Sequence, residues 1–528
     1  MDTKALRQKI LDLAIRGKLV PQDPNDEPAS VLLERIRQQK QQMVKEGKLK
    51  PKDIKNDSVI FVGEDNLHYE KFTNGSVKCI EDEIPFDLPE GWAWAFLSNI
   101  VYVLNGDRGQ SYPAKSKLRS KGIPFVSASN IQDGVVSSDG LLCLSDSQYD
   151  ALGAGKLFAG DIVYCIRGSL GKCGLFTMEK GAIASSLVIV RSLFDAPHII
   201  DYIFLYLNSA LAAGEIKKYD NGSAQPNLAA KDFRHFLVPL PPQAEMQRIN
   251  KQAREALVFV KRIQNNKDEL HAAIAVAKSK ILDLAIHGQL VPQDPADEPA
   301  SVLLDRIRTE REELIRQGKI KRDKKESVIF RGEDNSYYEK IGDKVENISD
   351  EIPFELPDGW MWCRGRSCFL GMESTKPQGE FFDYIDIDAI DNRLHRIKTA
   401  KHLPVPEAPS RASRAVKTGS VLFSLVRPYL ENIALVEEVH SHCIASTGFY
   451  VCSSNGILLP QFMFFLMISS YVVSGLNQYM KGDNSPSISK DNIESWLYPV
   501  PPMAEQKAIC TKLKKVFNLI EKVEKSLS

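Results

Sequence analysis

The chain has 528 residues, which is more than one ordinary hydrophobic core can organise, so two or three domains are expected. Apolar residues make up 43% and charged residues 26%, as in soluble globular proteins, and no apolar run reaches the roughly 18 residues of a membrane span. The 68 basic residues balance the 68 acidic ones, which argues against an overall basic DNA-binding surface. Any nucleic-acid contact must therefore come from local charge.

The N-terminal segment MDTKALRQKILDLAIRG is charged and has a helical apolar pattern at Leu6, Ile10 and Leu13, so it is not a signal peptide. The nine cysteines are scattered singly, with no C-x-x-C pair. This usage favours reduced thiols in the cytoplasm over a disulfide framework or a zinc site.

The N-terminal block begins an internal repeat that spans almost the whole chain. KILDLAIRGKLVPQDPNDEPASVLLERIR, from Lys9 to Arg37, recurs as KILDLAIHGQLVPQDPADEPASVLLDRIR from Lys280, an offset of 271 from Ile10 to Ile281. The later blocks keep the same order: SVIFVGEDN and SVIFRGEDN, then EIPFDLPEGWAW and EIPFELPDGWMW, which pairs Trp92 with Trp360. The last pair, VPLPPQAEMQRI and YPVPPMAEQKAI, has an offset of 260. Two copies of one unit are therefore predicted.

Between the last two blocks the similarity collapses, so each copy contains an insert, residues 95–235 in the first and 363–495 in the second. Mutational drift after duplication is one explanation. Uniform drift, however, would also have reduced the similarity of the repeated blocks that flank the inserts, which we call the frame. We therefore expect the two inserts to differ because they have different functions.

The first insert has a mixed α/β pattern, with glycine-punctuated strands from Gly155 to Phe176 and a buried helix from Ile199 to Leu207. Its loops hold side chains with donors that suit phosphates and base edges. Solvated loop charge is the alternative for any one of them. The candidates are Asn105, Arg108, Tyr112, Lys115, Lys117, Arg119, Lys121, Arg167, Lys172, Asn221, Gln225 and Asn227.

After Pro242 the sequence predicts a helix of about 45 residues, about 65 Å long, which stops near Gly288. Its apolar stripe has the alternating three- and four-residue spacing of a coiled-coil seam. The stripe comprises Met246, Ile249, Ala253, Ala256, Val260, Ile263, Leu270, Ile274, Ala277, Ile281 and Leu284, with a break at Lys267.

The second insert repeats the mixed pattern, with strands between Thr418 and Val436 and a buried helix from Pro460 to Val473. Its candidate DNA contacts are Lys376, Arg393, Arg396, Lys398, Arg411, Arg414, Arg427, Tyr429, Lys481, Asn484 and Ser485.

The C-terminal segment repeats the first half of the long helix, and the N-terminal segment repeats its second half. Two units arranged head to tail would then close on a twofold axis, with the terminal helices antiparallel to the central one. Unrelated arms, or helices that dimerise with another chain, are the alternatives. The fold expected is mixed α/β: two globular domains separated by long antiparallel coiled-coil helices. The boundaries expected are 1–82, 83–241, 242–288, 289–350, 351–501 and 502–528.

Catalytic motifs are not found. GSLGKC at Gly168 lacks the spacing of a phosphate loop, and GAGK at Gly153 precedes a strand pattern. Asp383, Asp386, Asp388 and Asp391 alternate with isoleucines as in a half-buried strand, and the nine histidines form no ligand pattern. No metal site, catalytic residue or methyltransferase motif is predicted.

The repeated ILDLAI-x-G-x-LVPQDP frame, the GDRG and GKLFAGDI segments and the two PP-x-AE exits together resemble the specificity subunit of a Type I restriction–modification system. The resemblance covers essentially the full chain. It implies two target-recognition domains, here the inserts, that read the two halves of a split DNA site while the helices hold them at a fixed separation.

The resemblance also implies two modification subunits that bind S-adenosylmethionine and methylate adenine, and restriction subunits that can add ATP- and magnesium-dependent translocation and cleavage. This chain itself would hold no cofactor and would have no catalytic activity. The alternatives are a coiled-coil protein-interaction adaptor and a stand-alone methyltransferase or nuclease.

Overall fold

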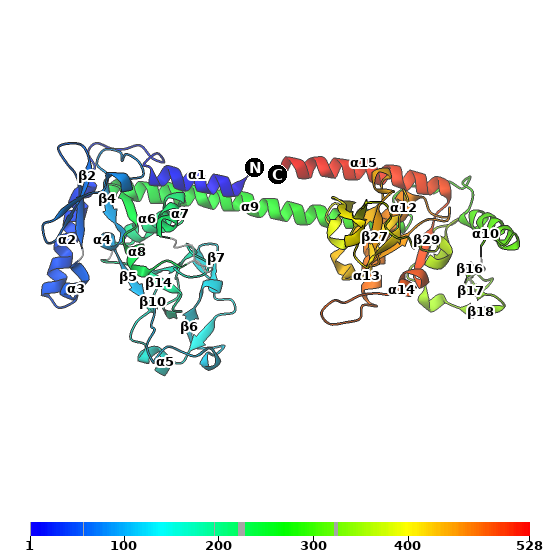
Figure 1. Ribbon diagram of the computed structural model, residues 1–528, viewed down its shortest axis with the longest axis horizontal. Coiled ribbons are helices and arrows are strands. Elements are labelled where there is room, and N and C mark those ends of the chain that lie inside the picture. The colour runs from blue at the N-terminus through cyan, green and yellow to red at the C-terminus, as the bar shows by residue number, and fades with distance from the viewer. Residues whose placement is uncertain (1, 56, 195, 220–226, 321–325, 528) are drawn as a thin grey trace. The chain divides into compact units, whose positions relative to one another are not determined.

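The computed structural model describes residues 2–527 except 56, 195, 220–226 and 321–325, and contacts divide the chain into two compact units (Figure 1). Unit 1 comprises residues 1–266 and unit 2 comprises residues 267–528. The boundary lies inside one long helix, α9 (Gln243–Ile286), so each unit contains one part of this helix. Among the described residues no single helix is long and apolar enough to cross a membrane. Two successive helices, Pro197–Leu207 and Ala210–Tyr219, reach that length and apolarity only when taken together, and they are bent by 67° relative to each other.

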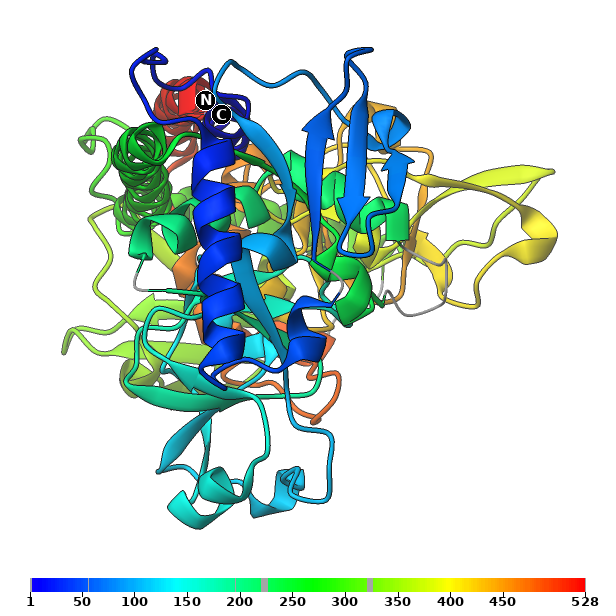
Figure 2. The ribbon, with the colours of Figure 1, turned by 90° about the vertical axis from the view of Figure 1, so that its left-hand side faces the viewer.

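In unit 1 the repeated frame forms four helices, a three-stranded antiparallel sheet in the order β1-β2-β3 and a two-stranded pairing of β4 with β15 (Figure 2). The frame elements are α1 (Thr3–Ile15), α2 (Ala29–Lys45), α3 (Pro51–Ile54), β1 (Ser58–Val62), β2 (His68–Phe72), β3 (Val77–Cys79), β4 (Ala93–Phe96), α4 (Leu97–Ile100) and β15 (Leu237–Leu240).

The first insert builds two sheets. One has six strands in the order β5-β14-β11-β12-β8-β7, and the other has four in the order β10-β13-β6-β9. The bounds are β5 (Val101–Asn105), β6 (Ile123–Val126), β7 (Ile131–Gln132), β8 (Val135–Val136), β9 (Leu142–Leu144), α5 (Asp146–Ala151), β10 (Lys156–Phe158), β11 (Ile162–Cys165), β12 (Cys173–Leu175), β13 (Lys180–Ile183), β14 (Leu187–Ser192), α6 (Pro197–Leu207), α7 (Ala210–Tyr219) and α8 (Ala230–Arg234). The strands predicted between Gly155 and Phe176 are confirmed, as is the buried helix.

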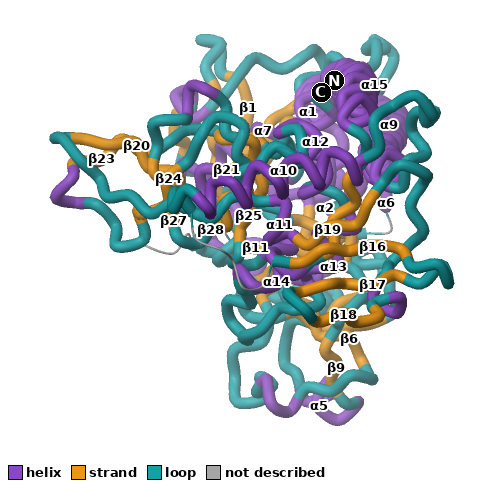
Figure 3. Tube along the Cα trace, turned by 90° about the vertical axis from the view of Figure 1, so that its right-hand side faces the viewer, coloured by secondary structure: helices purple, strands orange, loops and turns teal. Residues whose placement is uncertain are grey.

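Unit 2 repeats the frame as α10 with the sheet β16-β17-β18 and the pairing of β19 with β29 (Figure 3). These elements are α10 (Ala300–Arg316), β16 (Ser327–Arg331), β17 (Tyr337–Ile341), β18 (Lys344–Asn347), β19 (Met361–Arg364), α11 (Gly365–Cys368) and β29 (Leu497–Val500).

The second insert keeps part of the topology of the first although the sequences diverge. Its four-stranded sheet, β23-β20-β27-β24, matches the smaller sheet of unit 1, because each has a parallel pair at its centre. The bounds are β20 (Phe381–Ile385), β21 (Ile390–Asp391), β22 (Arg396–Ile397), β23 (Lys401–Pro404), β24 (Ala412–Ala415), β25 (Val421–Ser424), β26 (Ile433–Leu435), β27 (Ile444–Ser446), β28 (Phe449–Cys452), α12 (Pro460–Met467), α13 (Ser470–Asn477), α14 (Lys490–Ser495) and α15 (Met503–Leu527).

The helix predicted from Pro460 to Val473 is wrong as one element. The chain breaks after Met467 and begins again as α13, where the Ser469 hydroxyl accepts a hydrogen bond from the backbone N–H of Val472. Serine at this position satisfies a free N–H group of a helix start, which makes two helices favourable where apolar composition alone suggested one.

The terminal helices pair antiparallel with the long helix, as predicted, each within its own unit. Thr3 of α1 contacts Gln264 of α9 in unit 1. In unit 2 the Lys278 ammonium of α9 lies 2.9 Å from a carboxylate oxygen of Glu524 in α15. The predicted stop is confirmed, because Gly288 has a φ of +67° and its N–H bonds the carbonyl of Ala285.

The predicted seam of α9 is confirmed only in part beyond the boundary between the units, where Ile274 is buried and Ile281 packs against the unit 2 core. Met246, Ile249 and Ala253 are fully buried in the unit 1 core, but Leu270 and Leu284 are 39% and 41% exposed. The face that enters the unit 2 core also contains Leu282, Ala285 and Ile286, which the predicted seam did not include. Each part of the helix packs against one terminal helix and one globular core. Together these partners bury a partly different face of the helix from the one that a two-stranded coiled coil would bury.

Candidate nucleic-acid interface

Each insert is fixed to its frame by a buried cluster that the repeat duplicates. In unit 1 the Trp92 indole N–H donates to a carboxylate oxygen of Glu245 at 3.0 Å, and the Gln22 amide donates to the other oxygen at 3.2 Å. In unit 2 Trp360 and Gln293 donate to Glu505 at 2.7 and 3.0 Å. Burial raises the pKa of both carboxyls.

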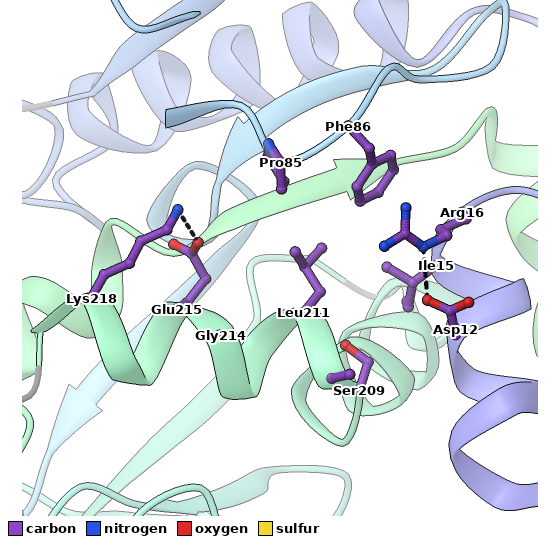
Figure 4. A pocket seen from close by; sticks show the side chains of 11 residues that line it. Asp12, Ile15, Arg16, Pro85, Phe86, Ser209, Leu211, Gly214, Glu215 and Lys218 are labelled. Atoms are coloured by element: carbon purple, nitrogen blue, oxygen red, sulfur yellow. Dashed lines mark hydrogen bonds and ion pairs between the residues drawn. The ribbon is translucent and has the colours of Figure 1, made fainter. Parts of the chain in front are cut away.

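A cavity of about 250 Å³ lies beside this joint in unit 1, between α1, α7 and the Pro85–Phe86 turn (Figure 4). Its polar groups already have partners inside the protein. Asp12 pairs with Arg16, whose guanidinium lies 4.4 Å from the ring centre of Phe86, and Glu215 pairs with Lys218. The charged side chains that line the cavity are therefore paired with one another, and we assign no ligand to it.

The β11–β12 hairpin presents the most closely connected candidates in unit 1. Leu228 donates its backbone N–H to Ile166 at 2.9 Å, which aligns Asn227 with Arg167, and the Arg167 Nε donates to the Asn227 side chain at 3.2 Å. Both side chains are exposed. The segment GSLGKC is thus a hairpin tip between two strands, in agreement with the rejection of a phosphate loop.

The GDRG segment lies next to this hairpin. The Asp107 carboxylate accepts hydrogen bonds from the backbone N–H groups of Gly109 and Gly153, which lowers its pKa and fixes the loop. A terminal nitrogen of Arg108 lies 3.4 Å from the carbonyl of Ser185, one residue before the Ser186 carbonyl that pairs with Ile166. The GDRG loop and the β11–β12 hairpin therefore contact neighbouring residues of the same segment, Ser185 and Ser186.

The β25–β26 hairpin is the counterpart in unit 2. Ile488 donates to Leu425 at 2.9 Å, as Leu228 does to Ile166. The backbone N–H of Arg427 donates to Pro486, and its guanidinium donates to the carbonyl of Asn484 at 3.0 Å. Arg427 and the loop with the predicted contacts Lys481, Asn484 and Ser485 thus form one exposed surface.

Each hairpin tip has two residues with positive φ, but the residue types at these positions differ. The tip of unit 1 has positive φ at Gly168 and Gly171, whereas the tip of unit 2 has it at Arg427 and Glu431. A left-handed conformation costs about 1–2 kcal/mol for a residue with a Cβ. Glycine accepts this backbone freely, so the second insert carries strain in order to place an arginine at its tip.

A third loop joins this surface in unit 2. The Asn392 side chain donates to the carbonyl of Leu430 at 2.8 Å, which links the β21–β22 turn to the hairpin tip. That turn carries the exposed residues Arg393 and Arg396. Sequence reasoning missed Asn392, because nothing in its neighbours indicates a partner 38 residues away.

Most of the other predicted contacts lie apart from these surfaces or have internal partners. Tyr112 packs edge-on against Phe125, and the Lys172 ammonium donates to the carbonyl of Ala128 at 2.8 Å. Arg414 is half-buried, with a side-chain nitrogen that has no partner. Tyr429 is exposed within the β25–β26 hairpin tip itself, between Arg427 and Glu431. The remaining candidates are exposed and lie outside the hairpin tips: Asn105, Lys115, Lys117, Arg119, Lys121, Lys376, Lys398 and Arg411. Asn221 and Gln225 lie outside the described residues.

The four alternating aspartates do not form the half-buried strand expected. Strand β20 ends at Ile385, so only Asp383 belongs to it. Asp386 accepts from the N–H of Ile387, Asp388 pairs with Lys401 at 2.7 Å, and Asp391 accepts from the backbone of the following turn. These short-range bonds favour turns over a continued strand.

The chain is similar to known proteins. The family model described as the Type I restriction modification DNA specificity domain matches residues 89–270. The chain is 27% identical to the Type I restriction enzyme EcoAI specificity subunit of Escherichia coli, over 99% of this chain and 90% of that protein. It is 26% identical to the EcoEI specificity subunit of the same species, with the same coverage.

A solved structure supports the fold. A chain from a structure concerned with the complex assembly and conformational transition of the type I R-M system matches with a TM-score of 0.52 and 16% identity, over 84% of this chain and 94% of its own. Together with the full-length relatives, this agreement extends beyond the matched domain to both units. Residues 89–270 thus match the DNA specificity domain of Type I restriction–modification systems, and nearly the whole chain is similar to Type I restriction enzyme specificity subunits.

Proposed function

We propose that each insert reads one half of a bipartite, asymmetric DNA site and that the long helices fix the spacing between the halves. The observation that carries this proposal is the pair of corresponding hairpin tips. In one, Arg167 bonds the side chain of Asn227, and in the other Arg427, one position further along the tip, bonds the backbone carbonyl of Asn484. Arginine and asparagine present donors that match the base edges of the major groove. Corresponding hairpins that present these donors from different positions would read unlike half-sites.

The helices supply the second part of the proposal. A helix of 44 residues that ends in two separate cores acts as a ruler, because its length is set by 1.5 Å per residue. Exposed apolar side chains on α9 and α15, among them Val258, Phe259 and Leu519, give the helices surfaces on which partner subunits can dock.

We further propose that two modification subunits dock on the frame and that restriction subunits can join them. The partners would bind S-adenosylmethionine, ATP and magnesium, and this chain, in the cytoplasm, would supply DNA recognition and no catalysis. The acidic side chains of the second insert support this division of roles between the chain and its partners. Asp386, Asp388 and Asp391 are engaged in hydrogen bonds or an ion pair within the protein.

The test is selection of random duplexes by the purified chain together with a modification subunit. We expect enriched duplexes to contain two different half-sites at one fixed spacing. Arg167→Ala should relax the sequence of one half and Arg427→Ala that of the other, each by about 1–3 kcal/mol of discrimination.

The control is Arg262→Ala, which removes an exposed arginine of α9 outside both inserts. It should leave both half-sites unchanged. If Arg167→Ala and Arg427→Ala relaxed the same half, or if selection gave one continuous site, the proposal would be wrong. Methyl transfer by the chain alone, measured with radiolabelled S-adenosylmethionine, should not exceed background.

A further inference from the structure

The four-stranded sheet of the second insert brings together metal-binding side chains from three distant segments. Asp383 lies on the central strand β20 and is directly paired in the sheet with His402 of β23. His442 and Cys443 immediately precede β27, the strand parallel to β20 on its other side. The four donors are spread over 60 residues of sequence, which is why no ligand pattern could be recognised there.

The side-chain atoms of these residues converge on one point. The Nε2 atom of His442 lies 2.7 Å from one carboxylate oxygen of Asp383, and the Sγ atom of Cys443 lies 4.0 Å from the same nitrogen. The ligand atoms of Asp383, His442 and Cys443 all lie within 4.8 Å of one another. The second oxygen of Asp383 lies 2.9 Å from Nδ1 of His402.

This geometry is close to that of a tetrahedral metal site. Zinc–ligand bonds of 2.0–2.3 Å place neighbouring donors about 3.3–3.8 Å apart. The His442–Asp383 pair is closer than this and the His442–Cys443 pair slightly farther, so small side-chain rotations would suffice. The two histidines are exposed and can rotate, whereas Cys443 is buried and fixed.

We propose that Asp383, His442 and Cys443 bind a divalent transition metal of the zinc class, with His402 orienting the carboxylate. A thiolate combined with imidazole selects zinc over magnesium or calcium, which prefer oxygen donors. The His402 bond to the second carboxylate oxygen matches the outer-shell contacts that hold metal ligands in place. The metal would tie β20 to the segment that leads into β27, and so would brace the outer sheet of this insert.

Unit 1 provides an internal comparison. Strand pairing in its equivalent sheet aligns Phe125 with Ala182, as Tyr384 aligns with Ile444 in unit 2. By this register the positions of Asp383, His442 and Cys443 correspond to Pro124, Lys180 and Gly181, and that of His402 to Cys143. Since these residues cannot form an equivalent ligand set, the proposal predicts one metal ion per chain, in the second insert.

The experiment uses the full chain, incubated with zinc ions, dialysed and analysed for metal by mass spectrometry. We expect one equivalent of zinc. Replacement by cobalt should give the absorption bands of tetrahedral coordination and a thiolate-to-cobalt charge-transfer band.

His442→Asn, at an exposed position, should abolish stoichiometric binding, and Cys443→Ser should remove the charge-transfer band. His402→Asn should weaken the affinity about 10–100-fold, as loss of an outer-shell partner does. The controls are His271→Asn and Cys79→Ser, which remove an exposed histidine of α9 and the one exposed cysteine, and both should bind zinc normally.

Circular dichroism of each variant shows whether it has folded. If Cys443→Ser does not fold, the exposed His442→Asn decides the outcome. A wild-type chain without stoichiometric zinc, or a folded His442→Asn chain that retains it, would overturn the proposal and leave Asp383 as a hydrogen-bonded partner of two histidines.

Discussion

The Trp92 indole N–H donates to Glu245 across 3.0 Å, and this bond joins two residues that lie 153 positions apart. Trp360 and Glu505 form the same bond in unit 2. The tryptophan stands where the frame enters the insert, and the glutamate stands in the first turn of the helix that leaves it. The bond therefore closes the base of each recognition domain, and conservation of both partners within the repeat follows from that position.

Replacing Trp92 by Phe should lower the free energy of unfolding by about 1–3 kcal/mol more than replacing Trp94 by Phe, because the buried Glu245 would lose a donor. Trp94 is the matched control, since it is also buried but its indole nitrogen has no partner. Both changes remove the same volume. Chemical denaturation of the two variants measures the difference, and equal losses would contradict the role of the bond.

The buried glutamates should make stability fall as pH rises above about 4.5. Burial raises the pKa of Glu245 and Glu505 in the folded state, so the folded chain binds these protons more tightly than the unfolded chain. Their favourable contribution is complete below the unfolded value and is lost as pH rises through the raised folded value. Denaturation across this range should show a smaller slope for the double variant Glu245→Gln, Glu505→Gln.

The control for this pH effect is Glu34→Gln. Glu34 is exposed and its pKa is lowered by a hydrogen bond from Arg37, so its contribution has the opposite sign and is lost as pH falls. The Glu34 variant should keep the decline above pH 4.5. If the free energy of unfolding depended on pH in the same way in the wild type and the double variant, the buried carboxyls would not be the cause of this decline.

The strained hairpin of unit 2 should separate stability from recognition. Asparagine tolerates the left-handed backbone better than arginine, so Arg427→Asn should raise the free energy of unfolding by about 0.5–1 kcal/mol. If the proposed function holds, the same change relaxes the reading of one half-site. Glu431→Asn relieves the same kind of strain without removing a candidate cation, so it should stabilise the chain and leave the selected sequence unchanged.

Shortening the central helix should shorten the DNA spacer. Deletion of the heptad from Glu269 to Ala275 removes about 10 Å of helix, which corresponds to about three base pairs. Selection of random duplexes by this variant with a modification subunit measures the new spacing. Replacing the same heptad by alanines keeps the length and is the control; an unchanged spacing in the deletion variant would refute the ruler.

Several features were accessible from sequence because they depend on local or repeated patterns. The long helix was predicted to within a few residues, because an unbroken apolar pattern and a terminal glycine such as Gly288 act through neighbouring residues. The limit of this reasoning appears at Leu284, which the pattern placed in the seam and the structure leaves exposed. Periodicity shows that a helix has an apolar face, but the partners decide how much of that face is covered.

The sequence by itself determined the duplicated frame, the divergent inserts and their mixed α/β class, because repetition and short-range periodicity are properties of the chain. Only the tertiary structure decided which side chains meet. Arg427 reaches Asn484, and Asp383 reaches His442, through strand pairings that join segments more than fifty residues apart. Such contacts depend on sheet order and register, which the packing of the whole core selects and no local pattern encodes.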